Sequence, residues 1–270
     1  MFDRILIPLD GSLPATSALY AGEQLADRLD ADLHVLTLTG KGRDDVGLGR
    51  LIERQVARIE GRPKVDVRPL SYSVAEDIAG EFDKVDETLV VMSTWARGRV
   101  AGVFGNVAED VLRMVRHPVV MLGPEAVIED RWLAGPLLVT TDGSHFGDSI
   151  APFAERFGSA LDLQPQLITV VDPTKVPAGL AMAAESNSVA GLAAGMTPAT
   201  GGPVAYDVLH GSEPAREIAD YANRYEASMI AMSTHGRSGA WRVTSGSVAM
   251  DVVRHARCPV LLSRPPSDEG

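Results

Sequence analysis

The chain has 270 residues, 45% of them hydrophobic, which is enough for one large or two ordinary domains with buried cores. Its formal net charge of −11 argues against a nucleic-acid or anionic-membrane surface, because clustered lysine and arginine bind such partners. The single cysteine, Cys258, excludes an intrachain disulfide and fits a reducing compartment. The start M-F-D-R-I-L-I-P lacks the apolar core of a signal peptide, and no apolar run reaches about 18 residues, so we expect a soluble, cytoplasmic protein.

Strands and helices are predicted to alternate through the first half of the chain. Apolar runs of strand length alternate there with longer segments whose apolar residues recur at helical spacing. We expect strands over 4–9, 33–38, 65–70, 88–94 and 119–122, helices over 13–29, 51–59, 74–85 and 107–116, and a charged glycine-rich loop over 40–49. This alternation predicts a parallel sheet with helices on both faces.

The second half repeats this plan. The phrase D-G-S at Asp10 returns at Asp142, an offset of 132, and Pro118-Val-Val returns as Pro259-Val-Leu, an offset of 141. Slowly drifting offsets indicate a duplicated domain with loop insertions. We expect strands over 137–140, 166–171, 204–209, 228–234 and 260–263, helices over 146–161, 214–225 and 248–257, and a loose helix over 181–194 beside a mobile loop.

The predicted fold class is therefore α/β, with two tandem doubly wound domains. Each domain is expected to be a five-stranded parallel sheet of order 3-2-1-4-5. The expected boundaries are 1–123 for the first domain, 124–135 for a linker, 136–264 for the second domain and 265–270 for a tail.

A Gly/Ser segment, S-T-H-G-R-S-G-A-W-R-V-T-S-G-S-V-A over 233–249, joins an apolar run to a helix-like run. Backbone N–H groups beside a helix N-terminus bind phosphate, although a mobile surface loop uses the same residues. In such a sheet ligands bind at the carboxyl ends of the strands, where the strand order reverses. Asp142 and Ser233 follow the first and fourth strands of their half, so both are expected at one crevice. No G-x-x-x-x-G-K-[ST] occurs and no G-x-G-x-x-G follows the first strand, which argues against a P-loop NTPase or a dinucleotide dehydrogenase.

This pattern resembles the universal stress proteins, whose ATP-binding members carry G-x2-G-x9-G-[ST] after the fourth strand. Here the spacing is kept by Ser233, Gly236, Gly246 and Ser247, with serine in place of the first glycine. The resemblance covers both halves nearly end to end. It includes P-L-D-G-S, T-D-G-S, T-V-V-D-P and H-A-R-C-P-V-L-L.

The resemblance implies an ATP site, with or without Mg²⁺, in the second half. Asp142 would lie by the adenine or ribose and Val170 against the adenine ring, while Gly236 would let the backbone approach the phosphates. The whole implied set is Thr140, Asp142, Val170, Met232, Ser233, Gly236, Gly246, Ser247 and Val248.

The matching set in the first half departs from the family pattern. It consists of Pro8, Asp10, Leu38, Met92, Ser93, Gly105, Asn106 and Val107. Ala96 stands where the second glycine belongs, the loop is one residue shorter, and Asn106 replaces the serine. A methyl group and a shorter loop hinder close approach to phosphate. If only one half binds ATP, we expect it to be the second.

Other interpretations of these residues stay open. Asp10 and Asp142 are also suited to be turn formers that cap their own backbone. The six histidines show no paired spacing for a metal, so we interpret them as structural or surface residues, and no G-x-S-x-G nucleophile elbow occurs.

The function that fits best is an ATP-binding universal stress protein, a nucleotide-dependent regulator in stress response or growth control. The alternatives are a weak Mg²⁺-dependent ATPase or phosphotransferase, for which no general base is evident, and a nucleotide-free interaction module. The resemblance also implies an intrachain pseudo-dimer that pairs through the last strands, 119–122 and 260–262, and is compatible with a homodimer.

Overall fold

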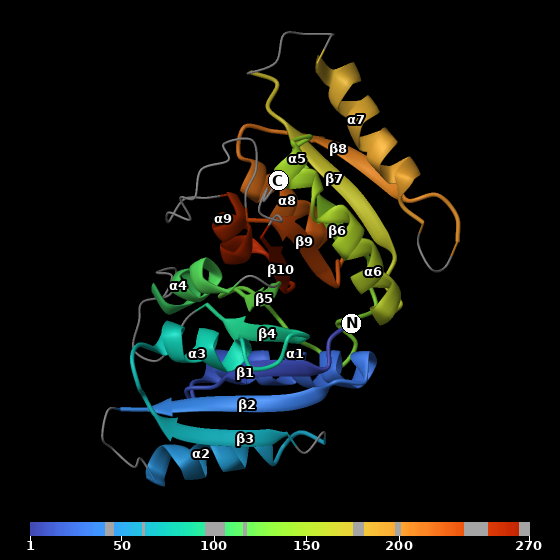
Figure 1. The fold of residues 1–270 in the computed structure, drawn as a ribbon. Helices are drawn as coiled ribbons and strands as arrows, with labels where there is room; N and C mark the ends of the chain where they lie inside the picture. The colour runs from blue at the N-terminus through green and yellow to red at the C-terminus, as the bar shows by residue number, and fades with distance from the viewer. Residues whose placement is uncertain are drawn as a thin grey trace. The chain divides into compact units, whose positions relative to one another are not determined.

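The structure, a computed structural model, describes residues 1–40, 46–60, 63–94, 106–115, 118–174, 181–197, 201–234 and 248–264. For Asn106 and residues 181–186 it describes the backbone alone. The chain divides into two compact units, Met1–Pro124 and Glu125–Gly270, which are coloured blue to green and green to red in Figure 1. Each unit is a parallel sheet with helices on both faces, so the predicted fold class is confirmed.

The first unit alternates strands and helices along the chain. Its elements are β1 Arg4–Pro8, α1 Leu13–Leu29, β2 Asp32–Thr39, α2 Val46–Val56, β3 Lys64–Pro69, α3 Val74–Phe82, β4 Thr88–Ser93, α4 Asn106–Met114 and β5 Val119–Leu122. The strand order is β3-β2-β1-β4-β5, and all neighbours are parallel. This is the expected order 3-2-1-4-5, in which the strand order reverses between β1 and β4.

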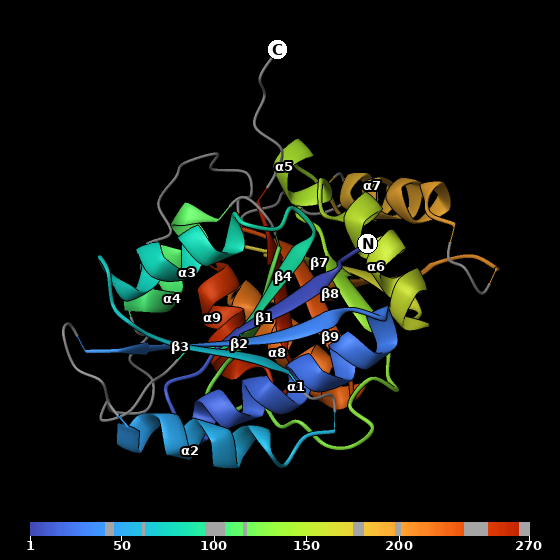
Figure 2. The ribbon, with the colours of Figure 1, turned by 60° about the horizontal axis from the view of Figure 1, so that its bottom comes forward.

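Successive side chains of β1 pack on opposite faces of the sheet, as strand geometry requires. Ile5 and Ile7 lie against α1, where a Cβ on Gly22 would come within 2.4 Å of Ile7 Cδ1, so a larger residue there would force the Ile7 side chain to move. Arg4 reaches the other face and bonds Glu81 of α3. Figure 2 shows α1 and α2 on one side of this sheet and α3 and α4 on the other.

The second unit follows the same plan with one helix divided. Its elements are β6 Leu137–Thr140, α5 His145–Asp148, α6 Ala151–Leu161, β7 Pro165–Val171, α7 Ala181–Gly195, β8 Ala205–His210, α8 Pro214–Arg224, β9 Met229–Ser233, α9 Val248–His255 and β10 Val260–Ser263. The strand order is β8-β7-β6-β9-β10, again with parallel neighbours. The reversal of strand order falls between β6 and β9.

Two predicted helices differ from the observed ones. The helix expected over 146–161 is broken into α5 and α6, because Pro152 has no N–H to donate to the carbonyl four residues earlier and its ring would clash there. The helix expected over 51–59 is α2, Val46–Val56. It begins inside the segment predicted as a loop, because Leu48 stands one turn before the buried Ile52 and continues the helical apolar spacing despite the two glycines. The loose helix expected over 181–194 is confirmed as α7.

The core of each unit lies between the central strands and the helices. β1, β4, β6 and β9 are buried on both faces, whereas the edge strands β3 and β8 are largely exposed. Phe82 in the first unit and Phe157 in the second are the largest fully buried side chains. Among the helices within the described ranges, none is both long and apolar enough to span a bilayer.

Candidate functional site

In the second unit, the strand register gathers the predicted residues at the carboxyl edge of the sheet. β6 pairs with β9 through Val139 and Ala231, so the turn that follows β6 lies beside the end of β9. This edge carries Thr140 and Asp142 after β6, Val170 near the end of β7, and Met232 and Ser233 at the end of β9. Val248 begins α9. Gly236, Gly246 and Ser247 lie outside the described residues.

Asp142 organises the turn that leaves β6. Its Oδ1 accepts hydrogen bonds from the backbone N–H of Ser144 at 3.0 Å and from the Ser144 hydroxyl at 2.5 Å. Gly143 adopts φ +72°, a left-handed conformation that favours glycine. Asp142 is therefore a turn former, as one interpretation of the sequence expected. A carboxylate offers about four acceptor positions, so a turn role and a ligand role are compatible.

Ser144 links this turn to the next helix. It is the N-cap of α5, and its hydroxyl accepts from the N–H of Gly147 at 3.0 Å. The turn has a second polar connection, in which the Thr141 hydroxyl donates to Asp148 and accepts from the N–H of Gly143 at 3.1 Å. Sequence reasoning missed Thr141 and Asp148, because neither belongs to the repeated D-G-S phrase. Their hydrogen bonds hold the carboxyl edge of β6 in a defined conformation.

In the first unit, a cavity of about 250 Å³ opens at the corresponding edge of the sheet. Its lining includes six of the predicted residues, Pro8, Asp10, Leu38, Met92, Ser93 and Val107. Of the other two, Gly105 lies outside the described residues and the side chain of Asn106 is not described. The structure thus brings together the described part of the set predicted for this half.

The walls of this cavity are mostly apolar. Val74 and Ile78 of α3 also line it, and sequence reasoning missed both, although they lie on the apolar face of a predicted helix. The carboxylate of Asp10 lies in this lining and accepts from the N–H of Ser12 at 2.9 Å. The volume is below the roughly 300–1,000 Å³ of typical small-molecule sites. These dimensions and walls suit a flat heterocycle with hydrogen-bond donors better than a whole nucleoside triphosphate.

A larger cavity of about 900 Å³ lies at the opposite, amino edge of the same sheet. Carboxylates dominate its lining, with Glu23, Asp27 and Asp30 from α1 and its end, Asp32 from β2, and Glu60. None of the predicted site residues belongs to this lining. These carboxylates outnumber the basic side chains in the lining and so disfavour a phosphate group, and we therefore place the candidate nucleotide chemistry at the carboxyl edge despite the smaller volume there.

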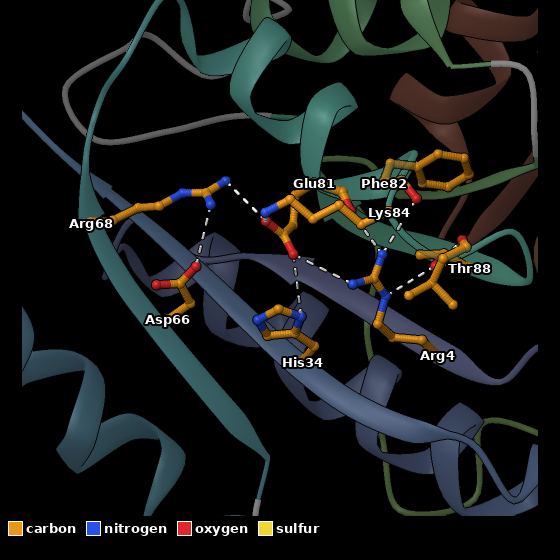
Figure 3. Close-up of polar contacts among 9 residues, drawn as sticks. Arg4, His34, Asp66, Arg68, Glu81, Phe82, Lys84 and Thr88 are labelled. Atoms are coloured by element: carbon orange, nitrogen blue, oxygen red, sulfur yellow. Dashed lines mark hydrogen bonds and ion pairs between the residues drawn. The ribbon is translucent and has the colours of Figure 1, made fainter.

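A cluster of charged side chains lies near that amino edge, and Figure 3 shows it centred on the buried Glu81 of α3. Arg4 Nη2 donates to the Glu81 carbonyl at 2.8 Å, and Arg4 Nε donates to the Thr88 hydroxyl at 3.0 Å. Lys84 and Arg68 approach the Glu81 carboxylate at 2.6 and 3.0 Å. Glu81 and Arg4 together thus connect β1, β3, α3 and the start of β4.

The cluster perturbs two titratable groups. Burial opposes ionisation of Glu81, yet the hydrogen bond and charge of Lys84, with the charge of Arg68, bring its pKa below the ordinary value. Burial also lowers the pKa of His34, whose Nδ1 lies 3.9 Å from the Glu81 carboxylate, an attraction that only partly opposes the shift. The prediction that His34 is a structural residue agrees with this enclosed position.

The second unit carries a counterpart of this cluster that has one carboxylate, Asp207, and, among the described residues, no basic side chain in its hydrogen bonds. The strand register matches His34 to Gln166, because His34 pairs with Lys64 and Gln166 pairs with Ala205 at the start of the next strand. Gln166 Nε2 donates to the Tyr221 hydroxyl at 2.6 Å, and that hydroxyl donates to Asp207. Burial, and then Asp207, raise the pKa of Tyr221. Since different groups make the same connection between strands and helix in each unit, we interpret both clusters as structural.

Comparison with known proteins relates both halves of the chain to one family. The sequence model of the Universal stress protein family matches residues 1–123 and 135–264. A universal stress protein of Mycobacterium tuberculosis is 29% identical over 187 residues, which cover 65% of this chain and 61% of that protein. The matches span between 33% and 61% of the length of the curated relatives.

Solved structures show the same fold. The crystal structure of a universal stress protein from Archaeoglobus fulgidus matches 97% of this chain and 98% of that chain, with 18% identity and a TM-score of 0.66. A universal stress protein in complex with cAMP matches 48% of this chain and 97% of that chain, with 19% identity and a TM-score of 0.37. The second likeness is too distant to bear on the ligand of this chain.

Proposed function

This chain belongs to the universal stress protein family, and we propose that its second half binds ATP, so that nucleotide occupancy regulates its interactions in stress response or growth control. The observation that carries the proposal is the position of the Asp142 turn beside the end of β9, at the reversal of strand order. In sheets of this kind ligands bind at that point. In the first unit a cavity occupies the corresponding edge, and its size and apolar walls suit the heterocyclic base of a nucleotide.

The proposed contacts follow from the chemistry of the residues. The Asp142 carboxylate accepts a hydrogen bond from a ribose hydroxyl or an adenine amine, while Val170 and Met232 offer apolar surface to the base. The phosphates meet backbone N–H groups at 236 and 246–248, where the G-x9-G-S spacing precedes α9. Mg²⁺ accompanies the phosphates if ATP binds as its metal complex.

The organisation of the chain is part of the proposal. We propose domains over 1–123 and 136–264, a linker over 124–135 and a tail over 265–270. The halves form a pseudo-dimer through their last strands, and the protein acts in the cytoplasm, where its one cysteine stays reduced. Sedimentation of the purified chain tests whether a homodimer forms in addition.

Isothermal titration calorimetry with ATP, with and without Mg²⁺, tests the nucleotide site. We expect Asp142→Ala to weaken ATP binding roughly 10- to 100-fold, because a charge-assisted hydrogen bond is worth about 1.5–3 kcal/mol. The matched variant Asp10→Ala should bind ATP as the wild type does, and Gly246→Val should abolish binding.

Three results would count against this assignment. If the wild type neither binds ATP nor carries adenine nucleotide after purification and denaturation, the nucleotide proposal fails. If Asp10→Ala loses binding and Asp142→Ala retains it, the site lies in the first half. Equal affinity in the wild type and Gly246→Val would refute the position given to the phosphates.

A further inference from the structure

The Asp142 carboxylate occupies space that a side chain at position 147 would fill. An ideal Cβ built on Gly147 would lie 2.1 Å from Asp142 Oδ1 and 2.9 Å from Asp142 Cγ. Real Cβ atoms do not come so close to other atoms, so this orientation of Asp142 requires glycine at position 147. Gly147 belongs to α5, and its backbone is helical. Its lack of a side chain therefore serves the carboxylate and not a special backbone conformation.

The first unit has a side chain at this position. The offset of 132 that relates Asp10 to Asp142 relates Ala15 to Gly147. The local frame is the same, since Ser12 caps α1 by accepting from the Ala15 N–H at 3.3 Å, as Ser144 accepts from Gly147 at 3.0 Å. If the Asp10 carboxylate adopted the orientation that Asp142 has, it would clash with the methyl group of Ala15. The two halves thus differ beside the aspartate itself, in addition to their glycine loops.

We propose that Gly147 is a positioning residue, which leaves room for the Asp142 carboxylate in the orientation that the nucleotide of the second half requires. The inference rests on the proposed ATP site, and it adds a reason why the second half, and not the first, binds ATP. With alanine at 147, the flexible end of Asp142 must turn away, because the helix backbone that carries the Cβ is less free to move. The hydrogen bond from the Ser144 hydroxyl at 2.5 Å is then lost.

The fold should tolerate this change. Alanine is a better helix former than glycine, which compensates part of the lost hydrogen bond. In the first unit alanine stands at the matched position, and Asp10 still accepts from the Ser12 N–H at 2.9 Å. An effect of Gly147→Ala on ATP binding would therefore arise from the orientation of the carboxylate and not from unfolding.

A double-mutant cycle on the full chain, with ATP as the ligand in titration calorimetry, tests this role. We expect Gly147→Ala to weaken ATP binding roughly 10- to 100-fold, as loss of a charge-assisted hydrogen bond would. In the Asp142→Ala background the same change should have no further effect, because the carboxylate is already gone. The matched variant Ala15→Gly should leave ATP binding by the second half unchanged.

An NMR measurement of the Asp142 χ1 rotamer in the nucleotide-free protein gives a second readout that does not depend on ATP. We expect a different rotamer in Gly147→Ala. An unchanged Asp142 rotamer in Gly147→Ala would overturn the inference, and so would an ATP affinity equal to that of the wild type. The inference would also fall if Gly147→Ala weakened ATP binding equally in the wild-type and Asp142→Ala backgrounds. If the wild type binds no ATP, the proposed function fails, and the rotamer alone then decides whether Gly147 orients Asp142.

Discussion

Replacement of Glu81 by glutamine should destabilise the first unit strongly. The change keeps the shape of the side chain but removes the negative charge at the centre of the buried cluster (Figure 3). Lys84, with 56% of its side chain exposed, can turn to water, and Arg68 retains Asp66 at 3.5 Å. Arg4 has only 10% of its side chain exposed, and it loses the carboxylate at 3.4 Å. Its guanidinium then stays buried and hydrogen-bonded but loses its counter-charge.

The expected loss follows from that geometry. Removal of one partner from a buried ion pair costs about 3–5 kcal/mol. Arg4 keeps its bonds to the carbonyls of residues 81 and 82 and to Thr88, so the lower end applies, about 3 kcal/mol. This loss corresponds to roughly 100-fold faster amide exchange through global opening, since about 1.4 kcal/mol equals a factor of ten.

Hydrogen exchange followed by mass spectrometry can assign the effect to one unit. Peptides from 1–124 should exchange about 100-fold faster in Glu81→Gln, and peptides from 125–264 should not change. The control is Asp110→Asn, which breaks an exposed pair with Arg113 and should change stability by less than about 1 kcal/mol. Exchange within threefold of wild type in Glu81→Gln, or equal acceleration in both units, would refute the reasoning.

Three further predictions concern other buried groups. Burial holds the pKa of His34 below its unfolded value of about 6.5, so His34 takes up a proton at a higher pH in the unfolded chain than in the folded one. The free energy of unfolding should therefore fall as the pH drops below about 6.5. His34→Gln should flatten this dependence in exchange measured between pH 7 and 5, and an unchanged profile would contradict it. Burial raises the pKa of Cys258 to about 12, so a disulfide reagent at pH 8 should modify this thiol only after the chain unfolds. Rapid modification of Cys258 in the folded protein would contradict this prediction. Tyr221→Phe removes the donor to Asp207 and should cost the second unit about 1 kcal/mol, seen as roughly fivefold faster exchange, whereas no change would show the bond to be dispensable.

Much of the fold could be predicted because its signals are local. Each strand is a short apolar run and each helix a longer amphipathic one, and the offset of 132 between Asp10 and Asp142 links the two halves without tertiary information. The prediction failed for α2 and for the helix that Pro152 divides. Two glycines favour a loop over 46–50, yet these residues form the first turns of α2. The long apolar pattern over 146–161 hides the break that the missing N–H of Pro152 causes.

The candidate site could be predicted from the sequence to about the same extent as the fold. Residues that end parallel strands share one edge of the sheet, so the position of Pro8, Asp10, Met92 and Ser93 around one cavity follows from strand order alone. Val74 and Ile78 were missed because their helix pattern shows which face is apolar but not that its first turns border a cavity.

By itself, the sequence determined the duplication, the α/β class and the strand ends that carry the candidate site, since each depends on periodicity or on a repeated phrase. Only the tertiary structure decided which groups touch. Glu81 meets Arg4 across 77 residues of sequence, and Asp142 lies in the space left by Gly147. Such contacts depend on how side chains from separate elements fill the same few ångströms, and no spacing along the chain encodes that geometry.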